Sequence, residues 1–153
     1  FIFGQDFGFS VDPTTLIKVA IDRDRKRMWI KTMFAKPGLS TKAIGELNRR
    51  YAEDNLIICD NAEPRLISEL QEYCNLKPTI KRKGSILSGI ALVQDYDLII
   101  DADSIELIKE LNNYVWHERN EKPVDKWNHQ LDALRYSAQY FLANANKGVY
   151  VIR

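Results

Sequence analysis

Three consecutive stretches at the start of the chain alternate in side-chain character and are separated by short polar turns. The stretches cover residues 1–10, 15–21 and 27–35, and the turns cover 11–14 and 22–26. Side chains two positions apart lie on the same face of a strand, so each stretch predicts a β-strand with two distinct faces. Because the connections are so short, the three strands are predicted to form an antiparallel meander.

The stretch 55–60 has a different pattern, because it is an unbroken apolar run that ends in Asp60. Such a run is typical of a strand covered on both faces, as in a parallel pair. We therefore predict an α/β domain with a mixed sheet, in which this fourth strand lies beside the first and parallel to it. Helices are predicted at 40–51, from Pro64 onward, and at 85–93, 104–112 and 125–144, and short strands at 78–80, 97–100 and 114–119.

Asp6 is the one carboxylate in the first predicted strand. Alternation places the odd-numbered residues, four of which are Phe, on one face, and places Asp6 between Gly4 and Gly8 on the other. We expect the aromatic face to be buried. Glycine in a strand often marks a close approach to the backbone, so these glycines predict room beside Asp6 for a metal ion and a phosphate. The alternative is a strand end with Asp6 solvated in a turn.

The predicted pairing of the first and fourth strands brings Asp60 next to Asp6. Two close carboxylates raise each other's pKa, and a divalent cation removes that cost. Oxygen ligands suit Mg²⁺ or Mn²⁺, and no segment of the sequence has the ligand spacing of a zinc site. The pair therefore predicts a site for a hard divalent cation.

The final predicted helix carries the third candidate acid. His129 and Asp132 are three residues apart and share one face of that helix. Asp132 lies at the border of the apolar stripe and in the first turns, where the helix dipole favours an acid. It is therefore either a metal ligand or a surface acid matched to the dipole. His129 is either a ligand or a capping or packing residue.

Lys81, Arg82 and Lys83 form the densest basic cluster, directly before Gly84 and the start of a predicted helix. Such a cluster can bind DNA phosphates, and the alternative is a solvated strand edge. The formal net charge of the chain is only +1. Any affinity for nucleic acid must therefore come from a local cluster such as this one.

Three segments together resemble the motifs of a known family. In this order and at this spacing, they are similar to the nuclease domain of the terminase large subunit of tailed phages, and the resemblance spans nearly the whole chain. The segments are Gly4-Gln5-Asp6-Phe7-Gly8-Phe9-Ser10 with Asp12-Pro13, Asp60-Asn61-Ala62-Glu63-Pro64, and Asn128-His129 with Asp132-Ala133 and Arg135-Tyr136.

The resemblance implies an RNase H-like fold and an endonuclease that cuts concatemeric viral DNA during genome packaging by two-metal phosphodiester hydrolysis. It implies Asp6, Asp60 and Asp132 as catalytic acids and as ligands of two Mg²⁺ or Mn²⁺ ions. It implies His129 as a further ligand or a substrate contact. Many RNase H-like nucleases have a fourth acid, for which the candidates are Asp125 and Glu63, although both also fit helix caps.

The resemblance also implies a biological setting. We expect residues 1–153 to form a single nuclease domain. Since the sequence has no GxxxxGK[ST] loop, we expect the packaging ATPase domain of the family to be absent from this chain. Double-stranded DNA, that ATPase domain, the small terminase subunit and the portal are the implied partners. The cytoplasm of the infected bacterial host is the implied location, and no apolar run is long enough for a membrane span.

Other classes of protein share parts of this pattern. Another RNase H-like nuclease or a Holliday-junction resolvase would use the same acids. An actin-like nucleotide-binding domain shares the sheet and the motif Asp6-Phe7-Gly8, but the large Phe9 and the lack of a second phosphate loop do not fit it. A non-catalytic interaction module would keep the acids only for folding.

Overall fold

The computed structural model describes residues 1–117 and 128–144. Its centre is a six-stranded mixed sheet in the order β5-β4-β1-β2-β3-β6. The strands are β1 (Ile2–Asp6), β2 (Pro13–Asp22), β3 (Arg27–Pro37), β4 (Ile57–Cys59), β5 (Leu76–Pro78) and β6 (Asp97–Ile100). The helices are α1 (Thr41–Ala52), α2 (Pro64–Leu70), α3 (Ser85–Gln94), α4 (Ile105–His117) and α5 (His129–Asn144).

The predicted strand pairing is confirmed. β1 pairs antiparallel with β2, and β2 pairs antiparallel with β3. β4 lies parallel to β1 on its other side, with Gln5 opposite Cys59. Two further parallel pairs, β4 with β5 and β3 with β6, complete the sheet. The chain thus has the predicted α/β architecture with a mixed sheet.

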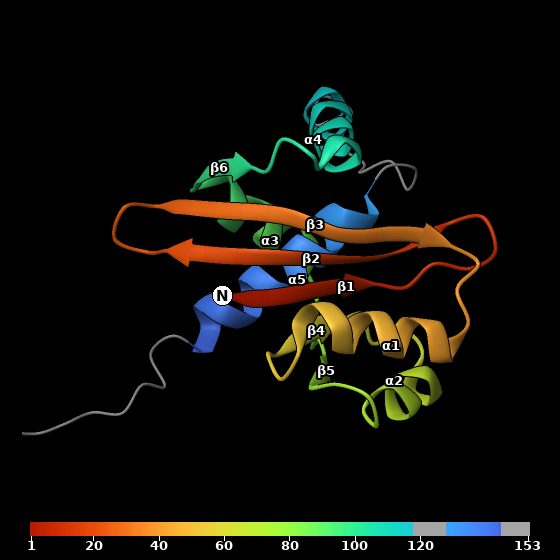
Figure 1. Cartoon of the computed structure of the whole chain (residues 1–153). Helices are drawn as coiled ribbons and strands as arrows, with labels where there is room; N and C mark the ends of the chain where they lie inside the picture. The colour runs from red at the N-terminus through yellow and green to blue at the C-terminus, as the bar shows by residue number, and fades with distance from the viewer. Residues whose placement is uncertain (118–127, 145–153) are drawn as a thin grey trace, which may run out of the picture.

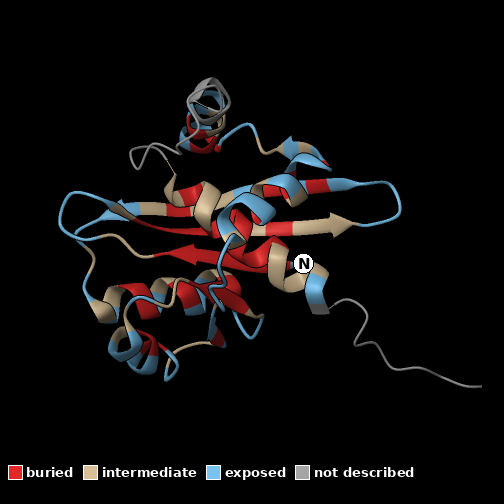
Figure 2. Ribbon diagram, turned by 180° about the vertical axis from the view of Figure 1, so that it is seen from behind, coloured by how far each residue is buried: buried red, intermediate tan, exposed pale blue. Residues whose placement is uncertain are grey.

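Helices cover both faces of this sheet (Figure 1). One hydrophobic cluster joins Phe3 and Ile57 of the strands to α1 and α2. A second cluster, on the other face, joins Ile17 and Ile58 to α3, α4 and α5, and α5 crosses behind β1 and β2 in Figure 1. Figure 2 shows that burial is concentrated where α5 meets the central strands. Among the described residues, no helix is both long and apolar enough to cross a membrane.

β1 is buried on both faces, which differs from the single aromatic face predicted for residues 1–10. All five residues of β1 are buried, whereas Phe1 and Phe9 are 64% and 71% exposed. The physical reason is position: β1 lies inside the sheet, so helices pack on both of its sides, while the two exposed rings lie beyond its ends. Among the four Phe residues of this stretch, Phe3 alone is fully buried.

Gly4 and Gly8 make room for the chain's own backbone. A Cβ atom at Gly4 would lie 2.0 Å from the carbonyl oxygen of Ala133 in α5. A Cβ atom at Gly8 would lie 2.1 Å from the carbonyl oxygen of Asp12. The prediction that these glycines clear space for a metal ion and a phosphate is therefore wrong. Their absent side chains allow a helix and a turn to approach the strand.

Several local predictions need a boundary correction. The segment 114–119, predicted as an edge strand, is helical through His117, because no Gly or Pro interrupts α4; residues 118 and 119 lie outside the described residues. The last helix begins at His129 in the structure, and the predicted start at 125–127 also lies outside the described part. The short strand expected at 78–80 lies at Leu76–Pro78. Cys59 and Cys74 are free thiols.

Candidate functional site

Asp6 and Asp60 lie at the same edge of the sheet. Asp6 is the last residue of β1, and Asp60 directly follows β4. Because Gln5 is opposite Cys59 in the parallel pair, the next residue on each strand falls beside the other. The amide of Asp60 also donates to the carbonyl of Gln5 at 3.3 Å. The side chain of Asp6 is only 11% exposed, and that of Asp60 is only 18% exposed.

The first turn of α5 brings His129 to the same edge. Asp6 Oδ2 accepts a hydrogen bond from His129 Nδ1 at 2.9 Å. This bond raises the pKa of His129, with burial opposing it. The other ring nitrogen, Nε2, lies 3.6 Å from Asp12 Oδ1 in the turn that follows β1. The imidazole therefore lies between two carboxylates of the first predicted motif.

Asp132 lies one turn further along α5. It is paired with Arg135, whose Nη2 is 3.1 Å from Asp132 Oδ1, and its side chain is 25% exposed. Burial raises the pKa of Asp132 to about 6; Arg135 opposes this shift and the charge of Asp6 adds to it. Asp132 is therefore a mostly buried acid rather than a solvated surface acid.

The charges of all three acids affect the pKa of Tyr136. Its pKa is raised above the usual value first by burial, and then by the negative charges of Asp132, Asp6 and Asp60. Burial likewise raises the pKa of Asp6, with His129 opposing and the charge of Asp60 adding to the shift. Such effects require proximity. The three carboxylates therefore lie within electrostatic range of Tyr136 in α5.

Each of these carboxylates is paired with a different basic side chain. Asp6 pairs with His129 and Asp132 with Arg135, while Lys81 Nζ lies 2.5 Å from Asp60 Oδ1. Within residues 1–117 and 128–144, no group of three or more His, Cys, Asp or Glu side chains is gathered closely enough to hold a metal ion. Asp6 and Asp60 thus lie together at the ends of their strands, and each of the three acids contacts a basic side chain.

The donor chemistry of this edge fits Mg²⁺ or Mn²⁺. Carboxylate oxygens are the ligands that these hard cations prefer. Burial is the main cause of the raised pKa of Asp6, and the charge of Asp60 adds to it; a bound cation would favour the charged form of Asp6. Of the candidates for a fourth acid, Glu63 precedes α2 without capping it through its side chain, and Asp125 lies outside the described residues.

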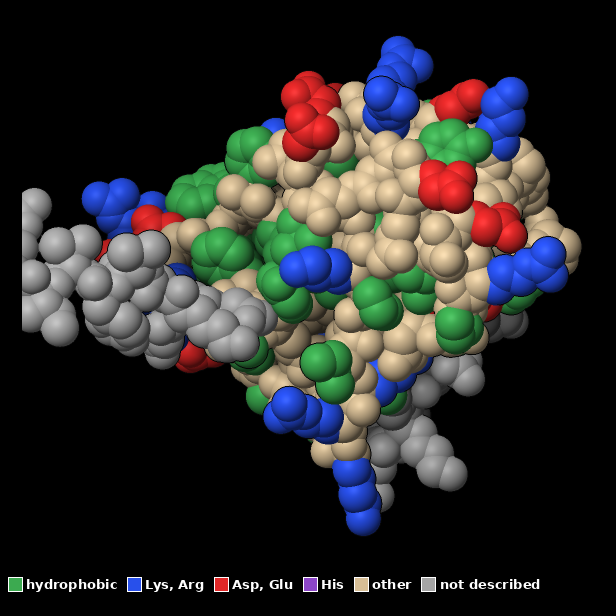
Figure 3. Space-filling model, turned by 90° about the horizontal axis from the view of Figure 1, so that it is seen from below, with side chains coloured by type: hydrophobic (Ala, Val, Ile, Leu, Met, Phe, Trp, Pro, Cys, Tyr) green, Lys and Arg blue, Asp and Glu red, His purple; other side chains and the backbone are tan. Residues whose placement is uncertain are grey.

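One residue of the basic cluster 81–83 forms an ion pair in the structure. All three residues are exposed, and Lys81 in addition pairs with Asp60. The face seen in Figure 3 carries its Lys and Arg side chains singly or in small groups among acidic and neutral ones, rather than as one continuous basic field. This dispersed pattern agrees with the net charge of +1.

Glu110 belongs to the site but was not identified from the sequence. This carboxylate on α4 is 6% exposed. Its Oε2 accepts hydrogen bonds from the backbone amides of Gln130 at 2.9 Å and Leu131 at 3.1 Å, so it caps the start of α5. Burial raises the pKa of Glu110 to about 7, with the two amides opposing. The contact joins two separate helices, so the sequence near Glu110 carries no signal of it.

Gln5, next to Asp6, also has a partner that the sequence did not indicate. Its side chain is fully buried and exchanges two hydrogen bonds with Asn48 of α1, at 2.7 and 2.8 Å. Buried amides are costly unless they are paired in this way. The pair therefore holds the end of β1 against α1, beside Asp6.

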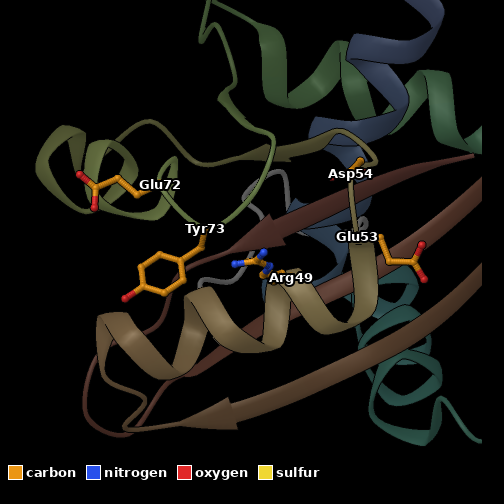
Figure 4. Close-up of a pocket in the computed structure, with 5 residues that line it drawn as sticks. All are labelled: Arg49, Glu53, Asp54, Glu72 and Tyr73. Atoms are coloured by element: carbon orange, nitrogen blue, oxygen red, sulfur yellow. The ribbon is translucent and has the colours of Figure 1, made fainter.

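A pocket of about 340 Å³ lies at the opposite edge of the sheet (Figure 4). Asp54 and Tyr73 precede β4 and β5, whereas Asp6 and Asp60 follow β1 and β4. The two features are therefore at opposite ends of the parallel strands. The pocket is lined by Arg49, Glu53, Asp54, Glu72 and Tyr73.

Residues 6–139 match the sequence profile of the family described as "Terminase RNAseH like domain". The chain belongs to this family. The matched region begins at Asp6 and includes Asp60, His129 and Asp132, the candidate site residues. The predicted relationship to the terminase large subunit and the predicted RNase H-like fold are both confirmed.

Solved terminase structures share this fold. The large terminase nuclease domain of bacteriophage SPP1, solved with bound Mn, is 26% identical, with a TM-score of 0.75 and coverage of 91% of this chain and 85% of that one. The P22 large terminase nuclease domain is 18% identical, with a TM-score of 0.73 and coverage of 94% and 80%. The large terminase of the thermophilic bacteriophage D6E is 20% identical, with a TM-score of 0.71; the match covers 92% of this chain but 39% of that one. No curated protein sequence matches this chain.

Proposed function

We propose that this terminase domain is a metal-dependent endonuclease that cuts concatemeric viral DNA during genome packaging, by two-metal hydrolysis of phosphodiester bonds. The observation that carries the proposal is that Asp6, at the end of β1, lies beside Asp60, at the end of β4, and that His129 at the start of α5 hydrogen-bonds to Asp6. The Mn bound in the SPP1 nuclease domain, which shares the fold, supports the choice of metal.

In this proposal Asp6, Asp60 and Asp132 hold two Mg²⁺ or Mn²⁺ ions. The chemistry supplied by such ions is activation of a water molecule and stabilisation of charge on the phosphate and the leaving 3′-oxygen. Asp6 is oriented by its hydrogen bond from His129, which remains a candidate ligand or substrate contact. Arg135 offsets the charge of Asp132 in the protein. No covalent intermediate on the protein is required.

The proposed substrate is double-stranded DNA, with Lys81, Arg82 and Lys83 as candidate phosphate contacts. We further propose that residues 1–153 act as a single nuclease domain and that packaging ATPase activity belongs to a separate domain. The sequence here has no GxxxxGK[ST] motif, and this chain spans 39% of the D6E large terminase. The small terminase subunit, the portal and the cytoplasm of the bacterial host follow from the family as the proposed partners and location.

A plasmid-nicking assay with Mn²⁺ tests the catalytic proposal. Asp6→Asn should lower the cleavage rate at least about 100-fold, because loss of even an outer-shell partner of a metal costs about 10–100-fold. Asp24→Asn, an exposed acid in the turn between β2 and β3, is the matched control and should cleave at the wild-type rate.

Thermal unfolding with and without Mn²⁺ separates loss of metal from loss of fold. A ligand at about 100 times its Kd stabilises the folded state by about 2.7 kcal/mol. The metal should therefore raise the Tm of the wild type and of Asp24→Asn, and leave that of Asp6→Asn unchanged. Full nicking activity in Asp6→Asn would rule out this carboxylate as a catalytic ligand.

A further inference from the structure

Lys81 lies between two anchored points of the chain. The amide of Thr79 donates to the carbonyl of Cys59 at 2.7 Å, which holds the segment after β5 against the end of β4. The amide of Ser85 donates to the carbonyl of Arg82 at 2.9 Å, and Gly84, with φ of 78°, leads into α3. Residues 79–84 therefore pass over the edge of the sheet where Asp60 lies, without forming a helix or strand.

The ammonium group of Lys81 provides positive charge at this acidic edge. Its Nζ is 2.5 Å from Asp60 Oδ1, an oxygen that also accepts from the amide of Asn61 at 2.8 Å. Its charge reaches a second acid as well: burial raises the pKa of Asp6, and Lys81 is among the groups that oppose that shift. One cationic side chain thus offsets the repulsion between the two carboxylates proposed to hold metal.

We infer that the Lys81 ammonium and a divalent cation compete for Asp60, and that a DNA phosphate, by taking the ammonium, favours loading of the metal. The inference rests on the proposed function, because it assumes that Asp60 is a metal ligand. A monovalent and a divalent cation on one carboxylate repel each other strongly, so occupancy by one disfavours the other.

The side chain of Lys81 is suited to such an exchange. It is 47% exposed, whereas the Asp60 side chain is 18% exposed, so the ammonium lies at the boundary between the acids and solvent. Lysine is a compact point charge on a flexible stem, and it binds phosphate as readily as carboxylate. By reciprocity, DNA that draws Lys81 away must strengthen metal binding by the same factor by which metal strengthens DNA binding.

The first test is Mn²⁺ binding to the whole chain without DNA, measured by titration calorimetry. Lys81→Met should bind Mn²⁺ at least about tenfold more tightly than the wild type, because the competing cation is gone. Lys77→Met is the matched control: it removes a positive charge from β5, four residues away, and it should bind within about twofold of the wild type. Equal or weaker Mn²⁺ binding by Lys81→Met would overturn the inference.

The second test adds a short DNA duplex and uses Ca²⁺ as the metal to be titrated. DNA should strengthen Ca²⁺ binding in the wild type and in Lys77→Met, and this gain should be absent in Lys81→Met. An equal gain in all three proteins would refute the phosphate exchange.

Asp60→Asn distinguishes failure of the inference from failure of the proposed function. If this variant loses metal binding while Lys81→Met binds as the wild type does, the inference alone is wrong. If Asp60→Asn binds metal as the wild type does, the proposed metal site and the inference both fail.

Discussion

Gly4→Ala tests the contact that positions α5, and with it His129 and Asp132. A Cβ atom at position 4 would lie 2.0 Å from the carbonyl oxygen of Ala133 and 2.7 Å from its carbonyl carbon. The first distance falls about 1.4 Å short of the 3.4 Å at which ordinary contact begins. Because the obstacle is backbone, the helix or the strand must move; a side-chain rotation is not sufficient.

The expected cost follows from that displacement. Overpacking a core costs about 1–3 kcal/mol, and a clash with helix backbone belongs at the upper end of this range. For a domain of this size, a loss of about 2–3 kcal/mol lowers the Tm by about 5–10 °C. A shift of about 1 Å in catalytic groups can reduce the rate about 100-fold, so nicking activity should fall well beyond the loss of folded protein.

Urea denaturation and the plasmid-nicking assay, run on the same preparations, measure both effects. Ile2→Val is the matched control, because it removes one carbon from the same face of β1 where Gly4→Ala adds one. It should cost about 0.5–1.5 kcal/mol and keep its activity when folded. Stability of Gly4→Ala within about 0.5 kcal/mol of the wild type, with normal cleavage, would refute the argued contact between β1 and α5.

Two further contacts make separate predictions. Glu110→Ala removes the cap of α5 and should cost about 1–2 kcal/mol in urea denaturation, and Glu110→Gln, which keeps an acceptor, should cost less. The folded-state pKa of Glu110 is raised to about 7 from 4.5, so the wild type should lose stability as the pH rises from about 4.5 to about 7. Glu110→Gln should lose less over that window, and an identical pH profile would contradict the assignment. Asn48→Ala leaves the buried amide of Gln5 without its partner and should cost about 1–3 kcal/mol, whereas Asn113→Ala, on the exposed face of α4, should stay within about 0.5 kcal/mol. Equal stability of the two Asn variants would show that the buried pair contributes nothing.

The sequence predicted the sheet well because strand pairing is encoded locally. Alternating side chains and short turns predicted the meander, and the unbroken apolar run before Asp60 predicted a parallel strand beside the first; both pairings are observed. These patterns report which faces of a strand are buried, and burial is the main determinant of pairing. Alternation within the first strand was less informative, because a strand inside the sheet is covered on both faces whatever its pattern.

The candidate site was predicted in part. The predicted parallel pairing of the first and fourth strands placed Asp60 near Asp6, and the observed register, with Gln5 opposite Cys59, agrees with it. The roles of Lys81, Arg135 and Glu110 beside these acids were not visible, because each contact depends on a side chain reaching across elements.

What the sequence by itself determined is therefore the order of the first four strands, the family and the choice of candidate acids. Only the tertiary structure showed the basic partner of each acid, the cap of α5 by Glu110, and the close approach of α5 that requires glycine at position 4. Periodicity and motifs are read along the chain, whereas a carboxylate's charge state and partner depend on which distant groups fold against it. At this edge of the sheet, those groups are basic side chains and a helix backbone.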